Sequence, residues 1–228
     1  MGQNVTLTAA DGHTLGAYRA DPAGPPKGAV VVVQEIFGVN SHIRSVCDRF
    51  AADGYVAIAP ALFDRQERGF ESGYTPEDVQ KARRFTAKID MDAYLRDVAA
   101  ARDAVKAAGP VAVVGFCLGG SVAFAAATRL DGIAAAVGYY GGRIAAIADE
   151  TPKVPTLLHF GDQDQSIPLA DVETVRAKRP DVEIHVYHAG HGFNCDARAS
   201  YEPESARIAW GRTMQTIANG FAAARGAA

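Results

Sequence analysis

The segment from Val111 to Phe124 reads VAVVGFCLGGSVAF and places Cys117 where a strand-like run becomes helical. Gly115 and Gly119 lie two positions on either side of the cysteine, and small residues there let neighbouring backbone approach. A side chain at this turn faces the amino end of the following helix, whose amide groups and dipole favour a negative charge. The environment therefore favours a thiolate, the nucleophilic form of cysteine.

The same residues also allow a purely structural interpretation, in which a small buried cysteine beside glycines packs a helix onto a strand. The predicted strand–turn–helix context favours catalysis instead. In that context, glycines spaced around a nucleophile form the nucleophile elbow of α/β-hydrolases, here with cysteine in place of serine. We therefore interpret Cys117 as a catalytic nucleophile.

A nucleophile of this kind needs an acid and a histidine, and they should follow it in that order along the chain. Strand TLLHF leads into the loop GDQD, and strand VEIHVY leads into the loop HAGHG. Both loops follow the carboxyl ends of strands, where the sites of open α/β sheets lie. We favour Asp164 over Asp162, which is interpreted as a turn residue, and the glycine-flanked His191 over His188.

The loop also permits a different chemistry, because His188, His191, Cys195 and Asp196 have a spacing that could hold zinc. Such a site would use His191 as a ligand and would abandon the triad. Three neighbouring ligands within one loop rarely complete a tetrahedral site without a fourth. We therefore predict no metal and no cofactor.

The elements that position these loops alternate between apolar strands and helices. Runs at 4–8 and 13–19 around Asp11-Gly12 predict an antiparallel hairpin. A helix capped by Ser41 and a helix starting at Thr75-Pro76 are further expectations. Other strands are predicted at 29–34, 55–59, 111–116, 133–140, 156–160 and 183–187, and helices at 41–52, 91–108, 118–130, 169–178 and 202–224. The pattern predicts an α/β fold with a mostly parallel sheet of seven or eight strands and helices on both faces.

Composition restricts the class of protein. The 228 residues are 48% hydrophobic and 21% charged, which favours one globular α/β domain over residues 1–228. A net charge of −3 gives no reason to expect nucleic acid or an anionic membrane as a partner. The start lacks the pattern of a signal peptide, and no apolar run has the length of a membrane span. Three widely spaced cysteines favour reduced thiols and hence the cytoplasm.

Five stretches follow one another in a characteristic order along nearly the whole chain: QEIFGVN at 34–40, GFCLGG at 115–120, VGYYG at 137–141, GDQDQSIP at 161–168 and AGHGF at 189–193. With these stretches the sequence resembles the dienelactone hydrolase family, also called carboxymethylenebutenolidases. QEIFGVN together with a cysteine elbow is the most specific part of the match. The resemblance implies the α/β-hydrolase fold and a Cys–Asp–His triad, which falls on Cys117, Asp164 and His191.

The resemblance also implies a role for Glu35. In the family, the glutamate of this motif lies next to the nucleophile and helps convert thiol to thiolate when substrate binds. A carboxylate close behind four valines is costly unless it is paired or hydrogen-bonded, which fits a site role or a structural bond to a loop. The backbone amides of Ile36 and Leu118 are the predicted oxyanion hole.

The match to the family fails at the residues that bind the substrate. The family binds the substrate carboxylate with two arginines, and the corresponding positions here are Val79 and Cys195. Aromatic positions of the family's pocket align with Arg83 and Thr86. Arginines elsewhere, including Arg198, could supply the charge. The predicted substrate-binding residues are Arg83, Arg84, Tyr140 and Phe193.

These observations predict a cysteine hydrolase that cleaves activated esters or lactones through a thioester acyl-enzyme. The alternatives are a non-catalytic ligand-binding protein with the α/β-hydrolase fold, or a metal site on the loop of His188, His191 and Cys195. The expected partner is a small ester or lactone, without nucleic acid or membrane. The expected assembly is a monomer or a weak homodimer.

Overall fold

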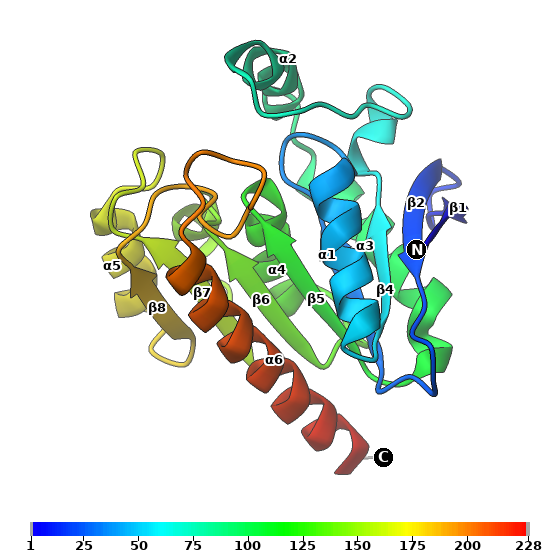
Figure 1. Cartoon of the computed structure of the whole chain (residues 1–228). Helices are drawn as coiled ribbons and strands as arrows, with labels where there is room; N and C mark the ends of the chain where they lie inside the picture. The colour runs from blue at the N-terminus through cyan, green and yellow to red at the C-terminus, as the bar shows by residue number, and fades with distance from the viewer. Residues whose placement is uncertain (1, 227–228) are drawn as a thin grey trace. The chain divides into compact units, whose positions relative to one another are not determined.

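The computed structural model describes residues 2–226 (Figure 1). The chain forms two compact units, Met1–Val111 and Ala112–Ala228. The two units are described separately below. The prediction of a single domain over residues 1–228 stays a prediction.

The first unit contains four strands, and its amino-terminal strands form the expected hairpin. β1 (Gln3–Thr8) pairs antiparallel with β2 (Thr14–Ala20), which pairs antiparallel with β4 (Val56–Pro60). β4 in turn pairs in parallel with β3 (Ala29–Val33), whose five residues are all buried. The loop of the predicted site, which begins at Gln34, therefore leaves the carboxyl end of a buried strand.

Helix starts in the first unit follow side-chain caps. α1 (Ser41–Ala52) begins after Asn40, whose side chain accepts the amide of Ile43. The prediction that Ser41 caps this helix is wrong, because the asparagine one residue earlier already makes the capping bond and Ser41 is the first helical residue. α2 (Pro76–Thr86) begins with the expected proline and a capping box between Thr75 and Asp78. α3 (Met91–Val105) follows, with short 3₁₀ turns at Leu62–Arg65 (η1) and Lys106–Ala108 (η2).

The second unit contains four parallel strands in chain order. They are β5 (Val111–Phe116), β6 (Ala135–Tyr139), β7 (Thr156–Gly161) and β8 (Glu183–Tyr187). The register places Phe116, Tyr139, His159 and His185 in one row across the four strands. Because the strands are parallel, the loops that follow them all leave from the same side of the sheet, at the carboxyl ends of the strands.

Helices of the second unit cover both faces of its strands. They are α4 (Leu118–Arg129), α5 (Leu169–Lys178) and α6 (Pro203–Gly226), with a 3₁₀ turn, η3, at Ile144–Ile147. α4 and α6 both contact β6. Figure 1 shows α6 in front of β6 and β7, with α4 behind. Within residues 2–226, no helix is both long and apolar enough to cross a membrane.

Candidate active site

Cys117 lies at the turn between β5 and α4 in a strained backbone conformation. Its φ of 55° and ψ of −114° are unfavourable for a residue with a side chain. The amide of Cys117 donates to the carbonyl of Tyr139 at 2.9 Å, which ties the turn to β6. A Cβ atom on Gly115 would lie 1.8 Å from the carbonyl oxygen of Gly119, so only glycine permits this close strand–helix approach. The local packing thus holds the thiol-bearing residue in a conformation that it would not adopt by itself.

Asp164 and His191 form a buried hydrogen-bonded pair in the same unit. Asp164 Oδ2 lies 2.7 Å from His191 Nδ1, and the aspartate side chain is 1% exposed. The other oxygen, Oδ1, accepts the amides of Ser166 at 2.7 Å and Ile167 at 3.1 Å. These three bonds satisfy the buried carboxylate and fix the imidazole with Nε2 directed away from it.

The imidazole of His191 also forms a hydrogen bond with the side chain of Cys117. Burial lowers the pKa of His191, but hydrogen bonds to Asp164 and Cys117 and their negative charges outweigh it and raise the pKa to about 10. The structure therefore brings together three residues from the ends of β5, β7 and β8. Their arrangement suits an imidazolium that is shared between a carboxylate and a thiolate.

The competing candidates, Asp162 and His188, form a separate pair at the surface. Asp162 Oδ2 lies 3.1 Å from His188 Nδ1, and the histidine side chain is 81% exposed. Cys195, by contrast, is buried. In the part of the chain that the structure describes, no three His, Cys, Asp or Glu side chains are grouped as a metal site requires.

The loop that carries His191 is held against the end of β7. A Cβ atom on Gly161 would lie 2.1 Å from the carbonyl oxygen of Ala189, so the glycine permits a close approach between the two loops. The amide of Gln163 donates to the same oxygen at 3.0 Å. The hydroxyl of Ser200 donates to the carbonyl of His191 at 2.7 Å. These contacts bring the loops of Asp164 and His191 side by side.

Tyr140 and Phe193, two of the predicted substrate contacts, lie around His191. Both side chains are buried, and the ring of Tyr140 lies 5.1 Å from the imidazole of His191 and 5.5 Å from the ring of Phe193. Tyr140 has a φ of 40°, which is rare for a bulky residue. No sequence pattern indicated this strain, because tyrosine has no preference for positive φ. Direct contact of either ring with substrate stays a prediction.

Glu35 is buried in the first unit, and its carboxylate is hydrogen-bonded as burial requires. Oε2 accepts the hydroxyl proton of Tyr74 at 3.1 Å, and Tyr74 in turn accepts an amide proton from the side chain of Asn40. The sequence did not point to Tyr74, which lies 39 residues from Glu35. Ile36 is half-buried in the loop after β3. The roles of Glu35 and Ile36 toward the thiol stay predictions.

Leu118, the other predicted oxyanion donor, is the first residue of α4. The amides of the first helical turn have no acceptor within their own helix. The amide of Leu118 is therefore positioned, by its place in the helix, to serve a ligand next to Cys117.

The predicted arginines lie in different settings. Arg84 bonds Glu67 at 2.6 Å and lies over the ring of Phe85 at 4.7 Å, whereas Arg83 is exposed on α2. In the second unit, the guanidinium of Arg198 lies so close to Gly192 that a Cβ there would be 2.4 Å from Nη1. Arg198 thus packs on the residue that follows His191.

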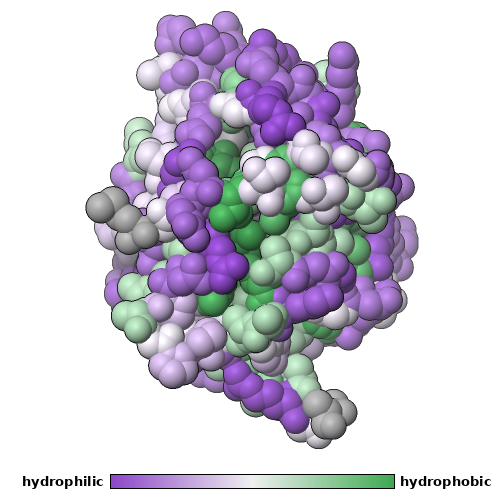
Figure 2. Space-filling model, turned by 90° about the vertical axis from the view of Figure 1, so that its right-hand side faces the viewer, coloured by the Kyte–Doolittle hydropathy of each residue, from purple (hydrophilic) through white to green (hydrophobic). Residues whose placement is uncertain are grey.

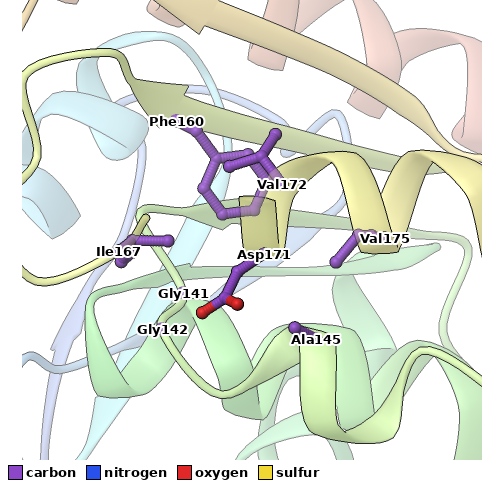
Figure 3. Close-up of a pocket in the computed structure, with 8 residues that line it drawn as sticks. All are labelled: Gly141, Gly142, Ala145, Phe160, Ile167, Asp171, Val172 and Val175. Atoms are coloured by element: carbon purple, nitrogen blue, oxygen red, sulfur yellow. The ribbon is translucent and has the colours of Figure 1, made fainter. Parts of the chain in front are cut away.

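A small pocket lies beside the loop of Asp164, between η3 and α5 (Figure 3). Its lining residues leave no room for a water molecule between them. Asp171 points its carboxylate toward Gly141 and Gly142, and Ile167 lies beside the same two glycines. The space is a packing defect rather than a substrate pocket.

The first unit contains a larger groove of about 300 Å³, between the β1–β2 hairpin and the segments after β3 and β4. On the face toward this hairpin, Figure 2 shows apolar side chains in a central strip between hydrophilic ones. The groove's charges neutralise one another, because Arg44 pairs with Glu71 and Arg68 lies 3.8 Å from Asp64. Its described lining residues include no thiol or imidazole.

Parallel strands alternating with helices, and a cysteine at a strained turn after β5, place the protein in the α/β-hydrolase class. The profile of the dienelactone hydrolase family matches residues 15–221. The chain therefore belongs to the dienelactone hydrolase family. This confirms the fold class and the family resemblance that the sequence predicted.

Relatives with established family names cover nearly the whole chain. The carboxymethylenebutenolidase of Pseudomonas putida is 32% identical over 95% of this chain and 96% of its own. A candidate carboxymethylenebutenolidase of Synechocystis sp. is 37% identical over 88% of this chain and 90% of its own. The crystal structure of a candidate dienelactone hydrolase from Klebsiella pneumoniae has a TM-score of 0.81 at 33% identity, and covers 95% of this chain and 99% of that one. The protein is therefore a hydrolase.

Proposed function

We propose that the protein hydrolyses activated esters or lactones through a thioester on Cys117. The observation that carries the proposal is the buried Asp164–His191 pair, 2.7 Å between Oδ2 and Nδ1, hydrogen-bonded to the cysteine of a strained elbow. An intact nucleophile, acid and base argue against the alternative of a non-catalytic ligand-binding protein.

In the first half of the reaction, the Cys117 thiolate attacks the substrate carbonyl carbon. A C–S bond forms, and the carbonyl electron pair moves onto oxygen, where the amides of Leu118 and Ile36 stabilise it. The C–O bond to the leaving group then breaks. The enolate or alkoxide takes the proton of the His191 imidazolium and leaves as the neutral product, so that a thioester and a neutral imidazole remain.

In the second half, His191 is the general base. Its neutral imidazole, held by Asp164, takes a proton from water, and the hydroxide adds to the thioester carbonyl. The tetrahedral intermediate collapses and expels the thiolate, which again pairs with the imidazolium. With a poor alkoxide leaving group, the tetrahedral intermediate would expel the thiolate more readily than the alkoxide. The cysteine therefore favours activated substrates such as enol lactones.

Other parts of the proposal follow from the sequence. Glu35 is assigned to thiolate formation, and Arg83, Arg84, Tyr140 and Phe193 to the substrate. The expected partner is a small ester or lactone, bound without a cofactor by a monomer or weak homodimer. No disulfide joins Cys47, Cys117 and Cys195 within the described residues, which supports a location in the reducing cytoplasm.

The pairing of Cys117 with His191 predicts an unusual pH dependence of alkylation. At pH 6.5 an ordinary thiol with a pKa of about 8.5 is only about 1% thiolate. Because the pKa of His191 is raised to about 10, its imidazolium lies hydrogen-bonded beside the sulfur of Cys117 at neutral pH. His191→Gln is therefore expected to slow iodoacetamide alkylation at pH 6.5 by roughly a hundredfold. The difference between the two proteins should shrink as the pH approaches the pKa of His191, about 10, because the imidazolium then loses its charge.

The alkylation rate reports on Cys117, because Cys47 and Cys195 are buried and burial raises the pKa of Cys47. His188→Gln is the matched control, since it removes the exposed histidine of the same loop and should leave the rate unchanged. Equal rates for the wild type and His191→Gln at pH 6.5 would refute the pairing.

A substrate panel tests the proposed function. Charge-assisted hydrogen bonds contribute roughly 1.5–3 kcal/mol each, and the family's two carboxylate-binding arginines are replaced by Val79 and Cys195. We expect kcat/KM for dienelactone to be lower than for an uncharged enol ester of similar size by on the order of a hundredfold or more. Hydrolysis of neither compound would contradict the proposed function.

A preference for dienelactone would instead show that another arginine binds the carboxylate. Arg198→Ala, Arg83→Ala and Arg84→Ala then identify it, because the responsible variant should lose activity on dienelactone and keep activity on the uncharged ester.

A further inference from the structure

A chain of polar side chains, all buried except the half-buried Arg212, lies next to the triad and has no part in the mechanism above. Arg212 Nη1 lies 3.0 Å from Tyr187 Oη, which lies 2.9 Å from His159 Nδ1. His159 Nε2 lies 3.1 Å from Thr213 Oγ1, which lies 2.7 Å from Tyr139 Oη. We call these five residues the His159 network. It joins β6, β7, β8 and α6.

One direction of hydrogen bonding satisfies every group of the network. Arginine can only donate, so Tyr187 Oη accepts from Arg212. In this direction Tyr187 donates its own proton to His159 Nδ1, and the neutral imidazole donates from Nε2 to Thr213 Oγ1. The threonine hydroxyl then donates to Tyr139. Loss of one link removes a hydrogen bond from each of the two groups that it joins.

His159 is neutral, as this direction requires. The side chain is fully buried, and burial, together with the nearby His185 and Arg212, lowers the pKa of His159 well below its usual range. The sequence predicts only a structural, hydrogen-bonded role for a histidine within a strand. The structure shows that both of its ring nitrogens are engaged.

The network ends at the backbone that carries the site. The carbonyl of Tyr139 accepts the amide of Cys117 at 2.9 Å, and the amide of Tyr140 donates to the carbonyl of His159 at 2.7 Å. Tyr140, with its φ of 40°, is strained, and such a residue persists only where its surroundings hold it. His159 thus stabilises the Tyr139–Tyr140 turn by two contacts. Its side chain bonds Thr213, which bonds the hydroxyl of Tyr139, and its carbonyl accepts the amide of Tyr140.

The same turn contacts the catalytic base. The ring of Tyr140 lies 5.1 Å from that of His191, and Phe193 packs at 5.5 Å from Tyr140 and 5.1 Å from Tyr187. Both the strained turn and the loop of His191 therefore contact members of the His159 network.

We propose that the His159 network positions the catalytic base: it holds the strained Tyr139–Tyr140 turn so that the ring of Tyr140 fixes the imidazole of His191 against Cys117. The inference rests on the proposed triad. Its members are positioning residues, since they act through Tyr140 and do not touch the reacting atoms.

Thr213→Val tests this proposal, because it removes one hydroxyl while keeping the shape of the side chain. We expect kcat for an activated aryl ester to fall by roughly tenfold to a hundredfold, with KM changed less than about twofold. Alkylation of Cys117 at pH 6.5 should slow in the same variant. Thr213→Ser restores the hydroxyl and should recover both rates.

Thr156→Val is the matched control. Thr156 is a buried threonine at the opposite end of β7, and its hydroxyl bonds only the nearby carbonyl of Val154 among the described contacts. It should lose thermal stability without losing kcat. If Thr213→Val does not fold, Tyr187→Phe breaks the chain one link earlier and should lower kcat in the same way.

A Thr213→Val protein that melts earlier but keeps kcat and the alkylation rate within about twofold would overturn the positioning role and leave the triad intact. Unchanged turnover in Cys117→Ala would overturn the triad and this inference with it. The two failures are therefore distinguishable.

Discussion

Cys117→Ala is expected to lower kcat for an activated aryl ester by roughly 10⁴-fold or more, the scale seen when the nucleophile of a catalytic triad is removed. The reason is that no covalent intermediate can form, so that only the residual acceleration from the oxyanion donors and substrate binding remains. Alanine removes only a sulfur atom at a partly exposed turn, so the fold should remain. Steady-state kinetics and a thermal melt of the same preparation measure both effects.

Cys47→Ala is the matched control for this experiment, because it removes a buried thiol from α1. It should cost some stability and keep the activity. Iodoacetamide should inactivate the wild type and the Cys47→Ala protein alike. Turnover that survives in Cys117→Ala would remove the cysteine mechanism, and activity lost to a chelator and restored by zinc would support the metal site instead.

Asp164→Asn is expected to reduce kcat by roughly 10³- to 10⁴-fold, as for other triads that lose the acid. Oδ1 of Asp164 accepts the amides of Ser166 and Ile167, and the asparagine oxygen must keep those two bonds. The new NH₂ group then faces His191 Nδ1 and donates to it. The imidazole proton is then held on Nε2, so that Nε2 can no longer accept a proton from water.

Asp162→Asn provides the comparison on the same loop. It alters the exposed pair with His188 and should leave kcat within about twofold of the wild type. The pH profile adds a second measurement, because the pKa of His191 depends on the charge of Asp164 and should fall in Asp164→Asn. Equal losses in the two variants would contradict the assignment of the acid.

The sequence predicted the elements well because each has local causes. The buried valines of β3, the capping box of α2 and the glycines around Cys117 act within a few residues of the structure that they specify. The cap of α1 was misplaced by one residue, since Asn40 and Ser41 are both good caps and only the backbone decides between them.

The candidate site was predictable only in part, because chain order identifies the candidate residues, whereas three-dimensional contacts distinguish one candidate from another. Two aspartates and two histidines lie in the right loops, and burial separates the pair of Asp164 and His191 from the exposed pair. The bond between Glu35 and Tyr74 and the strain at Tyr140 depend on residues far apart in the chain. No local pattern records such contacts.

The backbone of Cys117 has a consequence for how the sequence can change over time. A φ of 55° with a ψ of −114° is a conformation that glycine adopts at little cost and that a residue with a side chain resists. Folding alone would therefore favour glycine at position 117, and the chemistry that we propose for the thiol opposes it. In a descendant released from selection for turnover, this position should drift toward glycine, and the fold should become more stable as the enzyme is lost.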